Sequence, residues 1–234
     1  MSSILYAGVA ALGNVLGALV LTTRASWSRR TLEFVLAFSA GFLVAVSLGE
    51  LVPEAVSQGG IGAGGWILTG FVLVHLTQHA LVGHFHFGEE THEVSAEVGV
   101  TALVGLMLHT FVDGVAIATS FAVDGRLGAL VLLAVMLHKL PEGLAIGSLF
   151  VASGRSVRAA IGAALALGVA TVVGAAMSSR VALIATHGLA LAAGVTLYVG
   201  ASNLIPEFQG KRGWAHNAWF FIGVAGYGLL AGVV

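Results

Sequence analysis

Charged residues and cysteine are scarce in this sequence. Of its 234 residues, 9% are charged and 58% are apolar, whereas soluble domains carry roughly 25% charged residues. Apolar runs of about 20 residues, the length that an α-helix needs to cross a bilayer, recur along the whole chain. The composition excludes an ordinary soluble domain, and we predict an all-α, polytopic membrane protein. The absence of cysteine excludes disulfide bonds and thiolate ligands.

The apolar runs predict eight transmembrane helices in one domain that occupies residues 1–234. The first run, Ile4 to Leu21, has no basic residue in front of it, so we interpret it as a mature span and expect no cleavable leader. The predicted spans are 3–22, 32–53, 63–83, 98–121, 127–150, 157–178, 184–206 and 216–233.

Basic residues between the predicted spans indicate the orientation of the chain. If the N-terminus is extracytoplasmic, seven Lys and Arg residues fall in cytoplasmic loops and two in outer loops. Cytoplasmic loops are enriched in these residues, so this orientation is favoured, and an even number of spans places both termini outside. The cytoplasmic set is Arg24, Arg29, Arg30, Arg155, Arg158, Lys211 and Arg212.

A weak repeat relates the second predicted span to the seventh. The first reads Leu-Val-Pro-Glu at 51–54 and the other reads Leu-Ile-Pro-Glu at 204–207, so that Glu50 aligns with Asn203. By the loop charges the two spans run in opposite directions, which is typical of the inverted repeats of transporters. We therefore predict the order three helices, a central pair and three further helices. The alternative to a repeat is that Leu-x-Pro-Glu marks two similar helix ends by chance.

The central pair carries two copies of the pattern His-x-x-x-acid-Gly-x-Ala-Ile. One begins at His109, with Asp113 as its acid, and the other begins 29 residues later at His138, with Glu142 as its acid. Residues four apart share one helix face, and ionisable side chains inside a membrane usually mark a function. Both histidines fall near the middle of adjacent antiparallel spans, so we expect the four side chains to converge.

Two neutral imidazoles and two carboxylates would balance the charge of a divalent cation. A mixed nitrogen and oxygen shell suits Zn²⁺, Fe²⁺, Mn²⁺, Co²⁺ or Cd²⁺ better than Cu⁺, which prefers sulfur, or Ca²⁺, which prefers oxygen. A lone histidine on an apolar helix is more often a packed, hydrogen-bonded side chain. Two pairs with matching flanks favour an intramembrane metal site instead.

Proline and glycine beside these pairs are expected to shape the helices. Pro141 should free the backbone carbonyl of Leu137 and kink the helix near the second histidine. Gly114 and Gly143, which each follow an acid, should let neighbouring helices approach closely.

Lys139 lies in mid-span, where an unpaired lysine costs about 2.5–3.5 kcal/mol. Its partner could be Asp113, Glu142 or Glu50. We favour a fixed positive charge beside the metal; the alternative is a side chain that snorkels to the interface.

Histidines also gather between the third and fourth predicted spans. The polar segment 84–96, expected in the cytoplasm, contains His84, His86 and His92 together with three glutamates. Such a segment is typical of weak metal binding, and the alternative is a solvated loop. His75 and His79, four apart on the third span, either continue toward this loop or face other helices.

At these residues the sequence resembles the ZIP family of divalent-metal transporters. Members carry His-Asn/Ser-x-x-Asp/Glu-Gly on the fourth span and His-x-x-Pro-Glu on the fifth, and their second span commonly ends in Leu-Pro-Glu-Ala, here Leu-Val-Pro-Glu-Ala at 51–55. They also have eight spans, external termini and a His-rich cytoplasmic loop. The resemblance covers nearly the whole chain.

The resemblance implies uptake of Zn²⁺ or a related ion toward the cytoplasm, with His109, Asp113, His138 and Glu142 as ligands. It also implies a homodimer in the cell membrane and elevator-like movement of the inner helices against the outer ones. No resident cofactor and no nucleic-acid partner are expected, because the metal ion is the substrate.

Four positions depart from the family pattern. Members that bind two metals use Asn after the first His, an acid after the second and a carboxylate on span six; here Thr110 and Lys139 stand at the first two positions and span six has no acid. We therefore predict one metal ion, with the Lys139 ammonium near the place of a second. Glu50 replaces a frequent His and could gather cations at the outer mouth. Weaker candidates for residues at the entry or exit of the ion, or beside its ligands, are Glu54, Asn203 and Glu207, of which Glu207 would lie near the inner exit.

Alternating-access transport is thus the predicted function, and no enzyme activity is expected. The main alternative is an intramembrane metalloenzyme or haem protein that uses His109 and His138 as ligands, but haem does not require the paired acids. A structural scaffold would explain the apolar composition and not the repeated motif.

Overall fold

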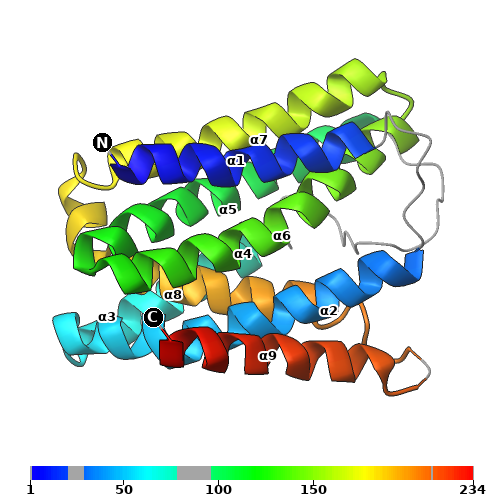
Figure 1. Cartoon of the computed structure of the whole chain (residues 1–234). Coiled ribbons are helices and arrows are strands. Elements are labelled where there is room, and N and C mark those ends of the chain that lie inside the picture. Colours follow the sequence, from blue (N-terminus) through cyan, green and yellow to red (C-terminus); the bar gives the residue numbers. More distant parts are fainter. Residues whose placement is uncertain (1, 21–28, 78–95, 212, 234) are drawn as a thin grey trace.

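The computed structural model describes residues 2–20, 29–77, 96–211 and 213–233, and within these ranges the chain is helical without strands (Figure 1). The predicted all-α class is therefore confirmed. The helices are α1 (Ser2–Val20), α2 (Arg29–Val46), α3 (Val52–Gly59), α4 (Gly62–Leu76), α5 (Ala96–Val123), α6 (Gly125–Ala152), α7 (Val157–Met177), α8 (Ala182–Tyr198) and α9 (Ala215–Val233), with π-helical segments η1 (Ser47–Leu51) and η3 (Val199–Leu204).

Six of the described segments are long and apolar enough to cross a membrane, which is consistent with the predicted polytopic membrane protein. They correspond to α1, α2 with η1 and α3, α5, α6, α7, and α8 with η3. Helix α4 is apolar but shorter, and α9 opens with the polar pair His216 and Asn217. The count of eight spans and their arrangement remain predictions.

The predicted end of the second span at residue 53 is wrong, because the helical run continues to Gly59. Pro53 stands inside this continuous run, two residues after η1, and cannot donate a backbone hydrogen bond there. In η1 the ladder has shifted by one residue, and the Val52 N–H donates to the carbonyl of Ser47. A π-bulge therefore carries the helix past the proline.

A second π-bulge occurs at the related position of the seventh predicted span. Segment η3 ends at Leu204, and the Ile205 N–H donates to the carbonyl of Gly200, ahead of Pro206. Both π-segments thus end two residues before the proline of a Leu-x-Pro-Glu sequence, and α2 and α8 run in opposite directions (Figure 1).

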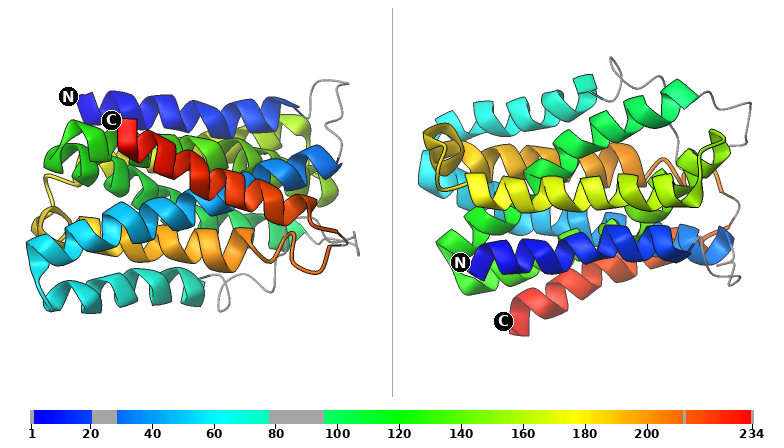
Figure 2. Two further views of the ribbon diagram at one scale, coloured as in Figure 1. Left: turned by 60° about the horizontal axis from the view of Figure 1, so that its bottom comes forward. Right: turned by 90° about the horizontal axis from the view of Figure 1, so that it is seen from above.

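The helices form two groups that lie one above the other in Figure 1. In the first group α1, α5, α6 and α7 contact one another, and in the second α2 packs on α9 and α4 packs on α8. Contacts of α5 with α8, and of α2 with α6, join the groups. Seen from two further directions in Figure 2, α1 begins and α9 ends at the same end of the molecule.

Glycines bring the backbones of the first group into close contact. A Cβ at Gly114 on α5 would meet the carbonyl of Thr171 on α7, and one at Gly143 on α6 would meet the backbone of Asn14 on α1. The expectation that these two glycines allow close approach is confirmed, and the approach fixes α5 and α6 against their neighbours beside each acid.

Candidate metal centre

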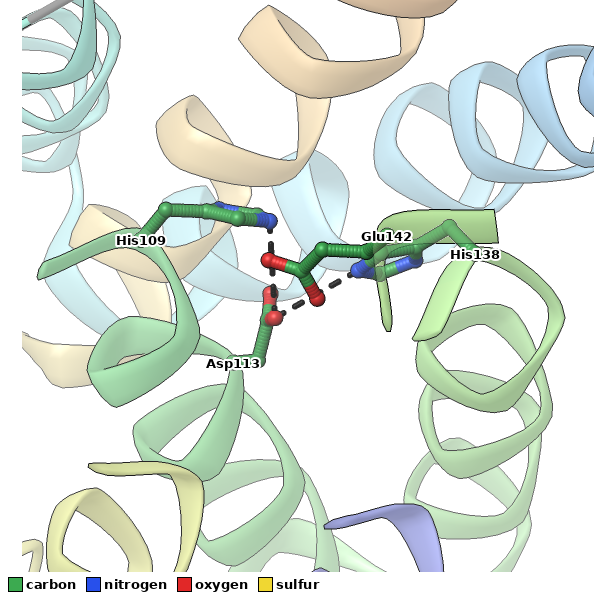
Figure 3. A group of neighbouring side chains, drawn as sticks. All are labelled: His109, Asp113, His138 and Glu142. Atoms are coloured by element: carbon green, nitrogen blue, oxygen red, sulfur yellow. Dashed lines mark hydrogen bonds and ion pairs between the residues drawn. The ribbon is translucent and has the colours of Figure 1, made fainter. Parts of the chain in front are cut away.

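The four predicted ligands lie together in the middle of α5 and α6. His109 and Asp113 project from α5, and His138 and Glu142 project from the antiparallel α6 toward them (Figure 3). All four side chains are buried, and one ligand atom from each can be chosen so that all lie within 4.8 Å of one another. The expected convergence is therefore observed, while the binding of an ion by these residues remains a prediction.

The distances within the cluster match those around a small cation. Asp113 Oδ2 lies 3.5 Å from His109 Nε2 and 3.4 Å from His138 Nε2. Ligands about 2.1 Å from a tetrahedral Zn²⁺ stand about 3.4 Å apart. The three atoms can therefore form two edges of a zinc coordination tetrahedron with small side-chain adjustments.

The contacts of His138 favour the neutral form of the ring in which Nε2 is the acceptor. Nδ1 lies 3.0 Å from the carbonyl of Ala134, and since a carbonyl only accepts, Nδ1 carries the hydrogen in the neutral ring. Nε2 then presents a lone pair toward Asp113 Oδ2, 3.4 Å away. In this form Nε2 can bind a metal ion, whereas in the doubly protonated ring it donates a hydrogen bond to Asp113 Oδ2.

Lys139 is fully buried and supplies a positive charge to the cluster. Its Nζ lies 2.7 Å from Asp113 Oδ2 on α5 and 3.1 Å from Glu142 Oε2 on its own helix. The snorkelling alternative is therefore wrong, and of the three partners considered, Glu50 is not the one used. The ammonium offsets part of the cost of burying two carboxylates in a medium of low dielectric constant.

Pro141 frees the backbone carbonyl of Leu137 as expected, while the kink near His138 stays a prediction. The carbonyl of Leu137, four residues earlier, accepts a hydrogen bond from Ser39 Oγ on α2 at 3.1 Å. The released acceptor is thus satisfied by the other helix group. Ser39 also lies 2.8 Å from its own Val35 carbonyl, so its hydroxyl hydrogen is shared or alternates.

A small cavity of about 20 Å³ borders the cluster, with room for a water molecule or a bare ion. It lies toward the end of the molecule where α2 and α5 begin and η3 ends. Asn203, one of the fainter sequence candidates, lines it. A cavity of this size does not accommodate a porphyrin, which disfavours the haem alternative. Its lining also includes Leu36, Leu106, His109, His138, Pro141, Glu142, Val199 and Leu204.

At the opposite end, Glu50 is held by an ion pair rather than exposed alone. Arg126 Nη2 at the start of α6 lies 2.9 Å from Glu50 Oε1 in η1, and Tyr227 on α9 donates to the same oxygen at 3.3 Å. Arg126 Nη2 also donates to the carbonyl of Ala231 at 2.8 Å. These bonds tie α6 of the first helix group to the second group at this end.

The remaining sequence candidates lie away from the cluster. Glu54 accepts from Gln58 at 2.9 Å, and Glu207 lies in the turns after η3. His75 Nδ1 lies 3.3 Å from the hydroxyl of Tyr198. Residues His79, His84, His86 and His92 are outside the described residues, as is the loop 84–96 except Ala96, where α5 begins.

One residue at the cluster was missed by the sequence analysis. Asn14 on α1 is fully buried, and its Nδ2 donates to Glu142 Oε2 at 2.9 Å. A signal was present, because Asn14 is the sole amide within the apolar run from Ile4 to Leu21.

Comparison with known proteins agrees with this geometry. Residues 86–232 match the model of the ZIP zinc transporter family, which is more than half of the chain and includes both His-x-x-x-acid pairs. The chain therefore belongs to the ZIP zinc transporter family, a family of metal transporters of the membrane. A search of curated proteins found no match.

Replacing Lys139 with methionine tests its place in the cluster. Lys139→Met leaves two buried carboxylates without their cation, so the metal-free protein should lose about 3–5 kcal/mol of stability. Added Zn²⁺ or Cd²⁺ should restore the melting temperature in detergent, measured by thermal unfolding.

The matched control is Lys211→Met. Lys211 pairs with Glu33 at 3.1 Å, but its side chain is 36% exposed, and an ion pair of this kind contributes only about 0–1 kcal/mol. A Lys139→Met protein that is as stable as the wild type without metal would contradict the assigned role of Lys139.

Proposed function

We propose that this chain transports a divalent transition-metal ion, with Zn²⁺ the preferred candidate and Fe²⁺, Mn²⁺ and Cd²⁺ alternatives, into the cytoplasm by alternating access. The ion binds between His109, Asp113, His138 and Glu142. The observation that carries the proposal is the convergence of these four buried side chains, of which one ligand atom each can be chosen so that all lie within 4.8 Å of one another. Membership of the ZIP family supports the same function.

The proposed topology has eight spans arranged as three, two and three. It adds α4 and α9 to the six long apolar segments. The twin π-bulges of the antiparallel α2 and α8 support the inverted repeat. The loop charges support external termini, and the family resemblance supports a homodimer in the cell membrane and a cytoplasmic loop at 84–96 that binds ions weakly.

On this topology the cavity beside the cluster faces the cytoplasm. It borders Asn203 and lies toward the end where α5 begins, whereas the ion pair of Glu50 and Arg126 closes the opposite end. Asn203 contacts the ion as it leaves, and Glu207 lies farther along the same exit.

Lys139 sets the number of ions and weakens their binding. Its ammonium already occupies the space between Asp113 and Glu142, at 2.7 and 3.1 Å, so a second cation would meet a like charge there. One ion is bound, and the neighbouring positive charge favours its departure. Protonation of a histidine ligand would also favour release, because protons and metal ions compete for the same lone pair.

Anomalous diffraction from Cd²⁺-loaded crystals counts the ions. We expect one anomalous peak in the cluster of the wild-type protein, because Lys139 excludes a second ion. Two adjacent peaks would contradict the one-ion site.

Removal of a ligand tests transport itself. His109→Ala should abolish Zn²⁺ uptake into proteoliposomes while the protein remains folded, because only three ligands are left. The matched control is His187→Ala on α8, where the ring stacks on Trp66 with centroids 4.3 Å apart; this variant should transport normally. Full uptake by His109→Ala would refute the assigned site.

Substitution of Glu50 tests whether this residue helps to gather ions at the outer mouth. Glu50→Gln should reduce uptake at low Zn²⁺ concentration, since it removes a carboxylate and leaves the positive charge of Arg126 without its partner at the outer mouth. The reduction should shrink as ionic strength rises, because salt screens exposed charges. Uptake that is unchanged at low salt would count against the role of Glu50 in gathering ions.

A further inference from the structure

The two oxygens of the Glu142 carboxylate have very different surroundings. Oε2 accepts from Lys139 Nζ at 3.1 Å and from Asn14 Nδ2 at 2.9 Å. Oε1 is buried and has no hydrogen-bond partner. A buried acceptor without a partner costs free energy, so one oxygen is saturated by the protein and the other is kept open.

We propose that Asn14 is a positioning residue for the transported ion. By holding Glu142 Oε2, its amide keeps Oε1 turned toward the ion and prevents the carboxylate from rotating so that Oε1 also faces Lys139. Asn14 lies on α1 and belongs to no His-x-x-x-acid pair, and the inference rests on the proposed function of the cluster.

The orientation of the Asn14 amide is fixed by its neighbours. Nδ2 faces two acceptors, Glu142 Oε2 at 2.9 Å and the carbonyl of Lys139 at 3.4 Å. A flipped amide would direct its own oxygen at both, which is unfavourable. In the orientation present, Asn14 Oδ1 is buried without a partner. A side chain that only stabilised the α1–α6 contact would not be expected to leave one end of its amide unsatisfied.

Close packing of α1 on α6 holds the amide in place. A Cβ at Gly13 would lie 2.8 Å from Lys139 Cβ, and one at Gly17 or Gly143 would meet the backbone of the opposite helix. Asn14 is 0% exposed between these glycines. The amide therefore has little freedom, as required of a group that sets the direction of a ligand.

The loss of this hydrogen bond should appear in ion affinity. Asn14→Leu keeps the side-chain size and removes the donor, so the Glu142 carboxylate can rotate and turn Oε1 away from the ion. Because partners of metal ligands typically contribute 10–100-fold to affinity, KM for Zn²⁺ uptake and the Zn²⁺ dissociation constant of the detergent-solubilised protein should both rise about 10–100-fold. Vmax should change much less than KM. Asn14→Ala removes the donor without adding volume and should give the same shift if the leucine variant does not fold.

A double-mutant cycle shows whether Asn14 acts through Glu142. In a Glu142→Ala background, Asn14→Leu should cause no further loss of Zn²⁺ affinity. An equal loss in both backgrounds would overturn the proposal, since Asn14 would then act on the ion directly. An unchanged dissociation constant with a lower melting temperature would also overturn it, because the role would be structural.

The control is Ser120→Ala. Ser120 is a fully buried polar residue on α5, and its hydroxyl has no partner, so this variant should leave Zn²⁺ affinity unchanged. Failure of the inference is distinguishable from failure of the proposed function. If His109→Ala abolishes uptake while Asn14→Leu leaves affinity intact, the inference alone fails.

Discussion

Neutralisation of buried charge is the constraint on which the rest of the structure depends. Asp113 and Glu142 lie in the interior of a helix bundle that spans a membrane, where an isolated carboxylate is very unfavourable. Lys139 compensates one of these charges, and a divalent ion added to the site overcompensates the other, which leaves the loaded cluster with one net positive charge. Residues that approach the pair therefore offer a donor, a cation or a metal-binding nitrogen, and the glycines of α5, α6 and their neighbours bring them within reach.

The part of the site that depends on helix periodicity could be predicted from the sequence. A spacing of four places His109 beside Asp113, and adjacent antiparallel spans place the second pair at the same depth. The release of the Leu137 carbonyl by Pro141 also follows from covalent geometry. The residue that satisfies it, Ser39, could not be predicted, because it comes from a helix far away in the sequence.

Packing between helices decided the features that the sequence left open. Asn14 was overlooked because nothing in one sequence states that α1 lies against α6, although the contact is made possible by Gly17 and Gly143. Lys139 had three candidate partners, and only the position of η1 relative to α6 removes Glu50 from that set. The helix that was expected to stop at Pro53 continues, because the π-bulge η1 carries it past the proline. This could not be predicted, because such a bulge is a tertiary adjustment without a strong local signal in the sequence.

Every side chain of the cluster comes from a single helix group: Asn14 from α1, one His–acid pair from α5, and the other pair with Lys139 from α6. In the elevator-like movement that the family resemblance implies, such a group would move as a unit. The ion would then keep the same ligands throughout and would not pass from one set of ligands to another. Ion preference and turnover become separable properties. The first would be set within the group that holds the cluster, and the second by the contacts of α5 with α8 and of α2 with α6, which join the two groups.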